Sequence, residues 1–162
     1  MATPPYYVNG KLVFKKASYS TSPWNFNRYY DTEGERTFLF DPKQLGFALY
    51  NEKGRLIGVG KAVGGANYCR DVGRPCRTVR GEFSIYKKGS KYCRSSAYPK
   101  PNGGAKMPYC MHFYRGYAIH GSYDLPEYHA SHGCIRVAPE AAQWMSVNFI
   151  NIGTKVVVLD YH

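Results

Sequence analysis

The sequence predicts a mostly β domain with a single helix near its C-terminal end. Three observations support this fold class. The 162 residues include 16 tyrosines, whose rings suit half-buried positions on strands. Short apolar runs alternate with turns that contain Gly, Pro, Asn or Asp. Only the stretch after Pro139 has the composition of a helix. A chain of this length suits one domain with its own hydrophobic core.

The strand candidates are short and are separated by turns or long loops. Asn51 and Gly54 mark a hairpin turn between two of them, and Asn9-Gly10 marks another. In chain order the candidates are residues 6–14 (as a hairpin), 37–40, 47–50, 56–59, 82–86, 109–120 and 156–159. The segments 62–81 and 87–106 are rich in Gly, Pro, Ser, Lys and Arg. We expect both to be long loops, which are often functional in a compact domain.

The predicted helix begins at Pro139, a residue that suits a first helical turn. Good helix formers follow, and Gly153 marks a later stop. Ala142, Met145 and Phe149 are spaced to share one face, which predicts packing against the core.

The first part of the chain, residues 1–35, is irregular in pattern. We expect it to pack on the domain through Trp24, Phe26 and Tyr29, and residues 36–162 to form that domain. The chain shows no internal repeat, no run long and apolar enough to span a bilayer, and no signal peptide at its start.

The formal net charge is +11 at pH 7, which predicts attraction to a polyanion such as nucleic acid, an anionic membrane or an anionic cell wall. No helix-turn-helix or zinc-finger pattern is present, so we expect no nucleic-acid partner. Four arginines form a spaced basic row, which is either a solvated face or a contact for anionic wall polymer; they are Arg70, Arg74, Arg77 and Arg80. We expect a monomer.

The chain has five cysteines, an odd number that leaves at least one thiol unpaired. Cys134 is the natural unpaired cysteine, because the preceding residues Ser131, His132 and Gly133 are typical of a reactive site. The other four allow three pairings; we favour Cys69–Cys76, which would close a loop containing Gly and Pro, with Cys93–Cys110 as the second. Disulfides would indicate a periplasmic or secreted protein; the alternative is four reduced, buried cysteines. No Cys-x2-Cys pair is present, and we expect no metal.

The residues between 119 and 137 carry the strongest chemical signal. His120-Gly121-Ser122 is followed after a spacer by Ser131-His132-Gly133-Cys134-Ile135-Arg136-Val137. A thiol attacks as its thiolate, although a free cysteine has a pKa of about 8.5. A nearby imidazole can take the proton and create the reactive ion pair. His120 ends a predicted strand and can approach Cys134 from another part of the fold, whereas His132 is only two residues away.

Two glycines of this stretch have predicted roles of their own. Gly133 lets the backbone bend and present N–H groups to an oxyanion. The Gly121 carbonyl is open to orient the His120 ring. A metal site built from His112, His120, His132 and Cys134 is the alternative, but acyl transfer already explains these residues.

This stretch resembles the signature of the L,D-transpeptidase catalytic domain family (YkuD-like). Residues 78–85, Thr-Val-Arg-Gly-Glu-Phe-Ser-Ile, resemble the family's Thr-Pro-x-Gly-x-Phe segment, with Val79 in place of proline. The resemblance covers residues 36–160, and the basic, cysteine-rich character also resembles the enhanced-entry branch found in intracellular bacterial pathogens. It implies a β-sandwich of mixed sheets with one helix after the nucleophile segment.

The resemblance also implies an activity on peptidoglycan stem tetrapeptides. Cys134 would attack the third residue, a diamino acid, D-Ala would leave, and an amine would accept the acyl group to form a 3→3 cross-link. His120 would be the base, the Gly121 carbonyl the third member of the triad, and the N–H groups of Gly133 and Cys134 the oxyanion hole. No cofactor is implied.

Five further residues are candidate substrate contacts: Ser131, His132, Arg136, Tyr114 and Ser122. For Tyr114 packing is the alternative, and for Arg136 a structural contact is the alternative. Two other functions stay open for the chain as a whole. One is a hydrolase of the same bonds, either an L,D-carboxypeptidase or an amidase. The other is a non-catalytic module that binds cell wall or host.

Overall fold

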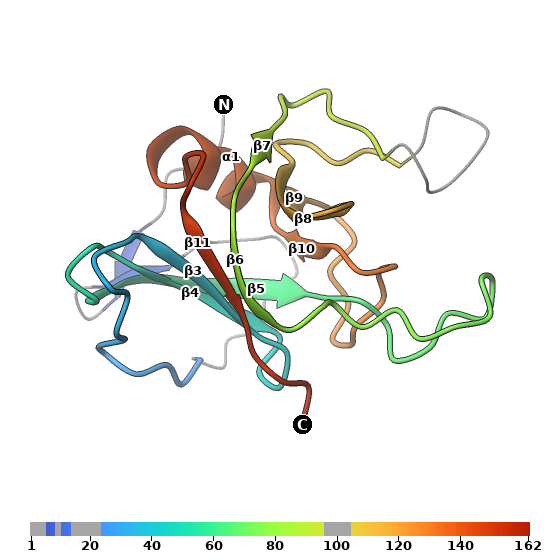
Figure 1. Cartoon of the computed structure of the whole chain (residues 1–162), viewed down its shortest axis with the longest axis horizontal. Helices are drawn as coiled ribbons and strands as arrows, with labels where there is room; N and C mark the ends of the chain where they lie inside the picture. The colour runs from blue at the N-terminus through green and yellow to red at the C-terminus, as the bar shows by residue number, and fades with distance from the viewer. Residues whose placement is uncertain (1–5, 9–10, 14–23, 96–104) are drawn as a thin grey trace.

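The structure is a computed structural model that describes residues 6–8, 11–13, 24–95 and 105–162. This part of the chain forms eleven strands and one helix (Figure 1). The elements, in chain order, are β1 (Tyr6–Val8), β2 (Lys11–Val13), β3 (Thr37–Asp41), β4 (Gly46–Tyr50), β5 (Leu56–Val63), β6 (Gly81–Ser84), β7 (Lys87–Lys88), β8 (Met111–Tyr114), β9 (Tyr117–Gly121), β10 (Ile135–Val137), α1 (Pro139–Asn148) and β11 (Lys155–Val158).

The strands form one mixed sheet in the order β6-β11-β3-β4-β5-β10-β9-β8-β7, with the β1–β2 hairpin added beside β5. β5 joins two halves, because it pairs with β4 along its length and with β10 at its end. The sheet curls, so that Phe83 of β6 and Phe113 of β8 lie with ring centroids 5.5 Å apart. The predicted mostly β fold with one helix is confirmed, and its two layers are halves of a single curled sheet.

The main core lies between the two halves of the sheet. β3 and β4 contribute Phe38, Phe40, Phe47 and Leu49, all fully buried. The facing half contributes side chains from β8, β9 and β10, and α1 closes one end. The residues between these on β3 and β4 face a second apolar cluster, so both faces of the strands are covered. This explains why their sequences are apolar runs without alternation.

The second cluster covers the outer face of β3, β4 and β5. Phe26 is buried there, and Trp24 and Tyr30 pack against it. The Tyr50 hydroxyl donates a hydrogen bond of 2.7 Å to the Asn27 carbonyl. Tyr29 was expected to pack here, but its side chain is exposed; the next ring, Tyr30, takes the place because the backbone pairs with Arg55 at Tyr29.

The helix α1 follows β10 directly and begins with Pro139, as predicted. Ala141, Ala142 and Met145 are buried against the core, and the helix packs on β9. The Lys88 ammonium donates hydrogen bonds of 2.6 Å to the Ser146 and Ile150 carbonyls, where a cation complements the negative end of the helix dipole. Within the described residues, no helix is long and apolar enough to cross a membrane.

The loop after β5, residues 64–80, extends to the right in Figure 1, and the described residues after β7 are 89–95, with 105–110 leading into β8. Cys69 is bonded to Cys76 within the loop after β5. Cys93, which follows β7, is bonded to Cys110, just before β8. Cys134 is the free cysteine.

Candidate active site

The pairing of β9 with β10 positions the two predicted catalytic side chains. The strands are parallel, with Ile135 level with Ile119 and Arg136 level with His120. Continuing this register puts Cys134 level with Ala118, two residues from His120. Ile119 and Ile135 face the core, so the alternate residues on each strand face the opposite way. Cys134 and His120 therefore share one face of neighbouring strands.

The His120 imidazole is buried and is oriented by its own backbone neighbour. Its Nδ1 lies 2.8 Å from the Gly121 carbonyl oxygen, an arrangement in which Nδ1–H donates and Nε2 is left to accept a proton. Burial lowers the pKa of His120 to about 4, and the nearby charges of Arg136 and His112 act in the same direction. The imidazole is therefore neutral near pH 7 and is available as a base.

The Cys134 thiol is half-buried, with its sulfur 3.7 Å from the Gly116 carbonyl oxygen in the β8–β9 turn. Burial raises the pKa of the thiol, and the charge of Arg136 offsets this only in part. The two pKa shifts together favour a neutral thiol beside a neutral imidazole. Both shifts therefore act against the ion pair expected from the sequence.

The backbone around Cys134 is held by two hydroxyl groups. Ser131 Oγ accepts a hydrogen bond of 3.1 Å from the Gly133 N–H and donates one of 2.6 Å to the Cys134 carbonyl. Thr78 Oγ1 donates one of 2.7 Å to the Gly133 carbonyl. Among the described residues, no acceptor lies on the Cys134 N–H. This N–H is the remaining donor of the segment.

These contacts change two expectations from the sequence. The Gly133 N–H was expected in an oxyanion hole beside that of Cys134, but it is engaged by Ser131. Ser131 itself was a candidate substrate contact, yet it is buried and its hydroxyl serves the backbone. Gly133 is required for its conformation: its φ is +140°, and a Cβ there would lie 2.6 Å from a Tyr117 ring carbon. The glycine thus shapes the turn into the nucleophile.

Three other predicted contact residues, His132, Arg136 and Ser122, have partners within the protein. His132 Nε2 lies 2.7 Å from an Asp71 carboxylate oxygen, which ties this histidine to the Cys69–Cys76 loop. Arg136 forms an ion pair of 3.2 Å with Asp124. Ser122 Oγ accepts a hydrogen bond of 3.0 Å from the N–H of the same Asp124.

Tyr114 is a packing residue. Its ring lies 5.2 Å from that of Phe83 and 6.1 Å from that of Tyr117, centroid to centroid. Its position in the aromatic packing across the curled sheet favours the alternative interpretation considered for it from the sequence.

Sequence reasoning missed a small apolar cluster beside the nucleophile. Met107, Cys110 and Ala118 form it, and Cys93 and Cys134 pack against it. The Cys93–Cys110 disulfide therefore covers the same face of the sheet that carries Cys134. No local sequence signal reports this, because the cluster joins residues from separate loops and strands.

Cys69, Asp71 and His132 offer ligand atoms within 4.8 Å of one another, the kind of set that can hold a metal ion. The sulfur of Cys69 is committed to the disulfide with Cys76, so it is not a thiolate ligand. Without a thiolate at Cys69, these three residues lack the sulfur ligand that a soft metal ion prefers.

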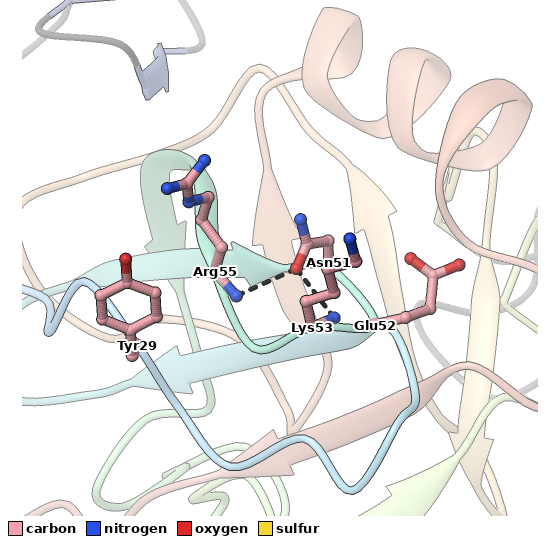
Figure 2. A pocket seen from close by; sticks show the side chains of 5 residues that line it. All are labelled: Tyr29, Asn51, Glu52, Lys53 and Arg55. Atoms are coloured by element: carbon pink, nitrogen blue, oxygen red, sulfur yellow. Dashed lines mark hydrogen bonds between the residues drawn. The ribbon is translucent and has the colours of Figure 1, made fainter.

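A pocket elsewhere in the fold is separate from these residues. It lies at the β4–β5 hairpin and is lined by Tyr29, Asn51, Glu52, Lys53 and Arg55 (Figure 2). The Asn51 side-chain oxygen accepts hydrogen bonds from the backbone N–H groups of Lys53 and Arg55 and so holds the turn. This hairpin is at the opposite end of β5 from β10.

Comparison with known proteins identifies the family. The model of the YkuD L,D-transpeptidase catalytic domain matches residues 35–158. The chain belongs to this family. A search of curated proteins gave no match. Among solved structures, the L,D-transpeptidase of Xylanimonas cellulosilytica is 27% identical with a TM-score of 0.70, over 83% of this chain and 65% of that one.

Two more distant structures share the fold. An L,D-transpeptidase from Stackebrandtia nassauensis is 17% identical, with a TM-score of 0.68 over 84% of this chain and 60% of that one. L,D-transpeptidase 3 of Mycobacterium tuberculosis, which carries a faropenem-derived adduct, is 22% identical, with a TM-score of 0.63 over 78% of this chain and 60% of that one. The chain thus spans less than two thirds of each of these structures.

Proposed function

We propose that this chain is an L,D-transpeptidase that forms a thioester on Cys134 with peptidoglycan stem tetrapeptides and transfers the acyl group to an amine. The observation that carries the proposal is the parallel β9–β10 pairing, which sets a neutral imidazole and the only free thiol of the five cysteines on one face. The Cys134 N–H beside them, which has no acceptor among the described residues, would supply a donor for an oxyanion. Residues 36–162 would form the catalytic domain, with the preceding segment packed on it.

The acylation step uses three groups of the site. Cys134 Sγ attacks the carbonyl carbon of the third stem residue while its proton passes to His120 Nε2. The carbonyl oxygen becomes an oxyanion that accepts a hydrogen bond from the Cys134 N–H. When the intermediate collapses, the bond to the terminal D-Ala breaks and His120 returns the proton to the leaving amine. The Gly121 carbonyl, bonded to Nδ1, stabilises the imidazolium formed on the way.

The second step releases the enzyme. An amine of another stem attacks the thioester, the thiolate leaves, and the proton lost by the amine returns to sulfur through His120. Water in place of the amine would give a hydrolase, which is the second candidate function. The substrate lies in the cell wall, outside the cytoplasm, and the two disulfides support a periplasmic or secreted location.

Attraction to an anionic wall surface remains part of the proposal on the strength of the net charge alone. Two arginines of the basic row have structural partners: Arg77 lies over the Tyr161 ring and donates to Asn67, and Arg80 pairs with Asp160. This favours a structural interpretation for that part of the row.

The test is incubation of the full chain with purified muropeptides that carry tetrapeptide stems, followed by mass analysis of the products. The expected result is release of D-Ala with formation of cross-linked dimers, and neither product with Cys134→Ala. Tripeptide stems without dimers would instead assign the hydrolase. Intact muropeptides after incubation with the folded wild-type chain would refute both and leave a non-catalytic binding module.

A further inference from the structure

Thr78 lies directly beneath the nucleophile segment, although it is distant from Cys134 in sequence. Its side chain is buried, with Oγ1 2.7 Å from the Gly133 carbonyl oxygen and 3.0 Å from the Gly65 nitrogen. A hydroxyl group has one proton to donate. Because the Gly65 N–H donates to Oγ1, the hydroxyl proton is directed to the Gly133 carbonyl.

That carbonyl belongs to the peptide bond that also carries the Cys134 N–H. A trans peptide is planar, and its C=O and N–H groups point in opposite directions. Holding the Gly133 carbonyl against Thr78 therefore points the Cys134 N–H away from Thr78. Ser131 holds the groups on either side of this peptide, the Gly133 N–H and the Cys134 carbonyl. The Thr78 hydroxyl is the partner that acts on the peptide itself.

Thr78 is itself held firmly in place. The Tyr161 hydroxyl accepts a hydrogen bond of 3.0 Å from the Thr78 N–H and donates one of 2.8 Å to the Gly65 carbonyl. Gly65 lies against the nucleophile segment, since a Cβ on it would lie 1.7 Å from the Cys76 carbonyl oxygen and 3.0 Å from the Gly133 Cα. Buried hydrogen bonds in such a network hold their geometry tightly.

We propose that Thr78 is a positioning residue whose hydroxyl aims the Cys134 N–H at the oxyanion formed during acylation. The inference rests on the proposed function and goes beyond it, because it assigns a role to a residue that touches neither the substrate nor the attacking sulfur. It predicts that loss of the hydroxyl slows steps that build an oxyanion and spares reactions of the thiol that build none.

Two reagents for Cys134 separate these cases. Faropenem acylates: the S–C bond forms at the β-lactam carbonyl, an oxyanion develops, the ring C–N bond breaks, and the thiol proton passes through His120 to the ring nitrogen. Iodoacetamide alkylates: the S–C bond forms, iodide leaves, the thiol proton goes to solvent, and no oxyanion arises. Rates for both are read by intact-protein mass spectrometry on the full chain with its disulfides intact.

The key variant is Thr78→Val, which keeps the shape of the side chain and removes the hydroxyl. Acylation is expected to slow by about 10- to 100-fold, less than the loss of an oxyanion donor outright, while alkylation keeps the wild-type rate. Thr78→Ser restores the hydroxyl and is expected to restore acylation.

Tyr161→Phe is the matched control. Like Thr78→Val, it leaves two backbone groups of the same network without their partner, but it keeps the Thr78 hydroxyl on the Gly133 carbonyl. It is expected to lower the melting temperature comparably and to acylate faster than Thr78→Val. Acylation that instead falls in step with melting temperature in both variants would mean a purely structural role and would overturn the proposal.

Two further outcomes are decisive. Acylation of Thr78→Val at the wild-type rate, or slow acylation of a folded Thr78→Ser, would also overturn the positioning role. If Thr78→Val does not fold, Thr78→Ala removes the same hydroxyl and takes its place in each of these comparisons. Wild-type protein that alkylates but is never acylated would instead count against the proposed function.

Discussion

Acidification is expected to destabilise this fold specifically through His120. The imidazole is 7% exposed, and its pKa in the folded protein is about 4, against 6.5 in an unfolded chain. Between these two values the unfolded state binds more protons than the folded state. Stability is therefore unaffected by His120 above pH 6.5 and is lost as the pH falls towards 4.

The magnitude follows from the two pKa values. Between pH 7 and pH 5 the expected loss from this one group is about 2 kcal/mol, and it approaches about 3 kcal/mol near pH 4. Other groups titrate over the same range, so the measurement is a difference between two proteins. His120→Asn is the reference, because its amide can still donate to the Gly121 carbonyl and does not titrate.

The assay is urea unfolding of both proteins at pH 7 and pH 5, followed by tryptophan fluorescence with the disulfides intact. The wild type should lose about 2 kcal/mol more than His120→Asn on acidification. Equal losses, to within about 0.5 kcal/mol, would show that the buried imidazole is not held neutral. The same pKa predicts that acylation of the wild type keeps its base in the active form down to about pH 5.

Three other changes test separate parts of the structure. Gly133→Ala should slow acylation about 100-fold, because a Cβ would meet the Tyr117 ring and the positive φ is strained for alanine. The rate of faropenem labelling measures this effect, and a wild-type rate would contradict the described geometry of Gly133. Replacing Cys93 and Cys110 together by Ser should lower the free energy of unfolding by about 3 kcal/mol, since their disulfide closes a loop with a sequence separation of 17; an unchanged urea midpoint would argue against the bond. Met145→Ala should cost about 2–5 kcal/mol, as the side chain is fully buried where α1 meets the core, and calorimetry can compare the two proteins.

Much of the fold follows from local sequence. Apolar runs bounded by turn residues located β3, β4, β11 and the first half of β5, and Pro139 located the start of α1. The end of β5, at Ala62 and Val63, was expected in a loop but pairs with β10. The strand β10 was not predicted, because three residues next to a catalytic motif carry too short a pattern to identify a strand. Nor could the sequence say which of two adjacent rings, Tyr29 or Tyr30, faces the sheet, since that depends on the pairing of this segment with Arg55.

The candidate site also contains residues that the sequence predicted and residues that it did not. His120, Gly121 and Cys134 could be proposed from the sequence because two short motifs, His120-Gly121-Ser122 and residues 131–137, carry the residue types that thiol chemistry uses. The role of Ser131 could not, since a hydroxyl that holds the backbone and one that faces a substrate look alike in sequence. Thr78 and Tyr161 lie 83 residues apart, and only the folded sheet brings their hydroxyl groups together under Gly133.

The pairing of four cysteines has a practical consequence for the fifth. With both disulfides closed, Cys134 is the one sulfhydryl in the chain that can take a maleimide or a fluorescent tag. Counting attached dye per molecule then counts free Cys134, with no signal from the four paired cysteines. Buffers with strong reductants would forfeit this advantage, because they would turn one reporter into five.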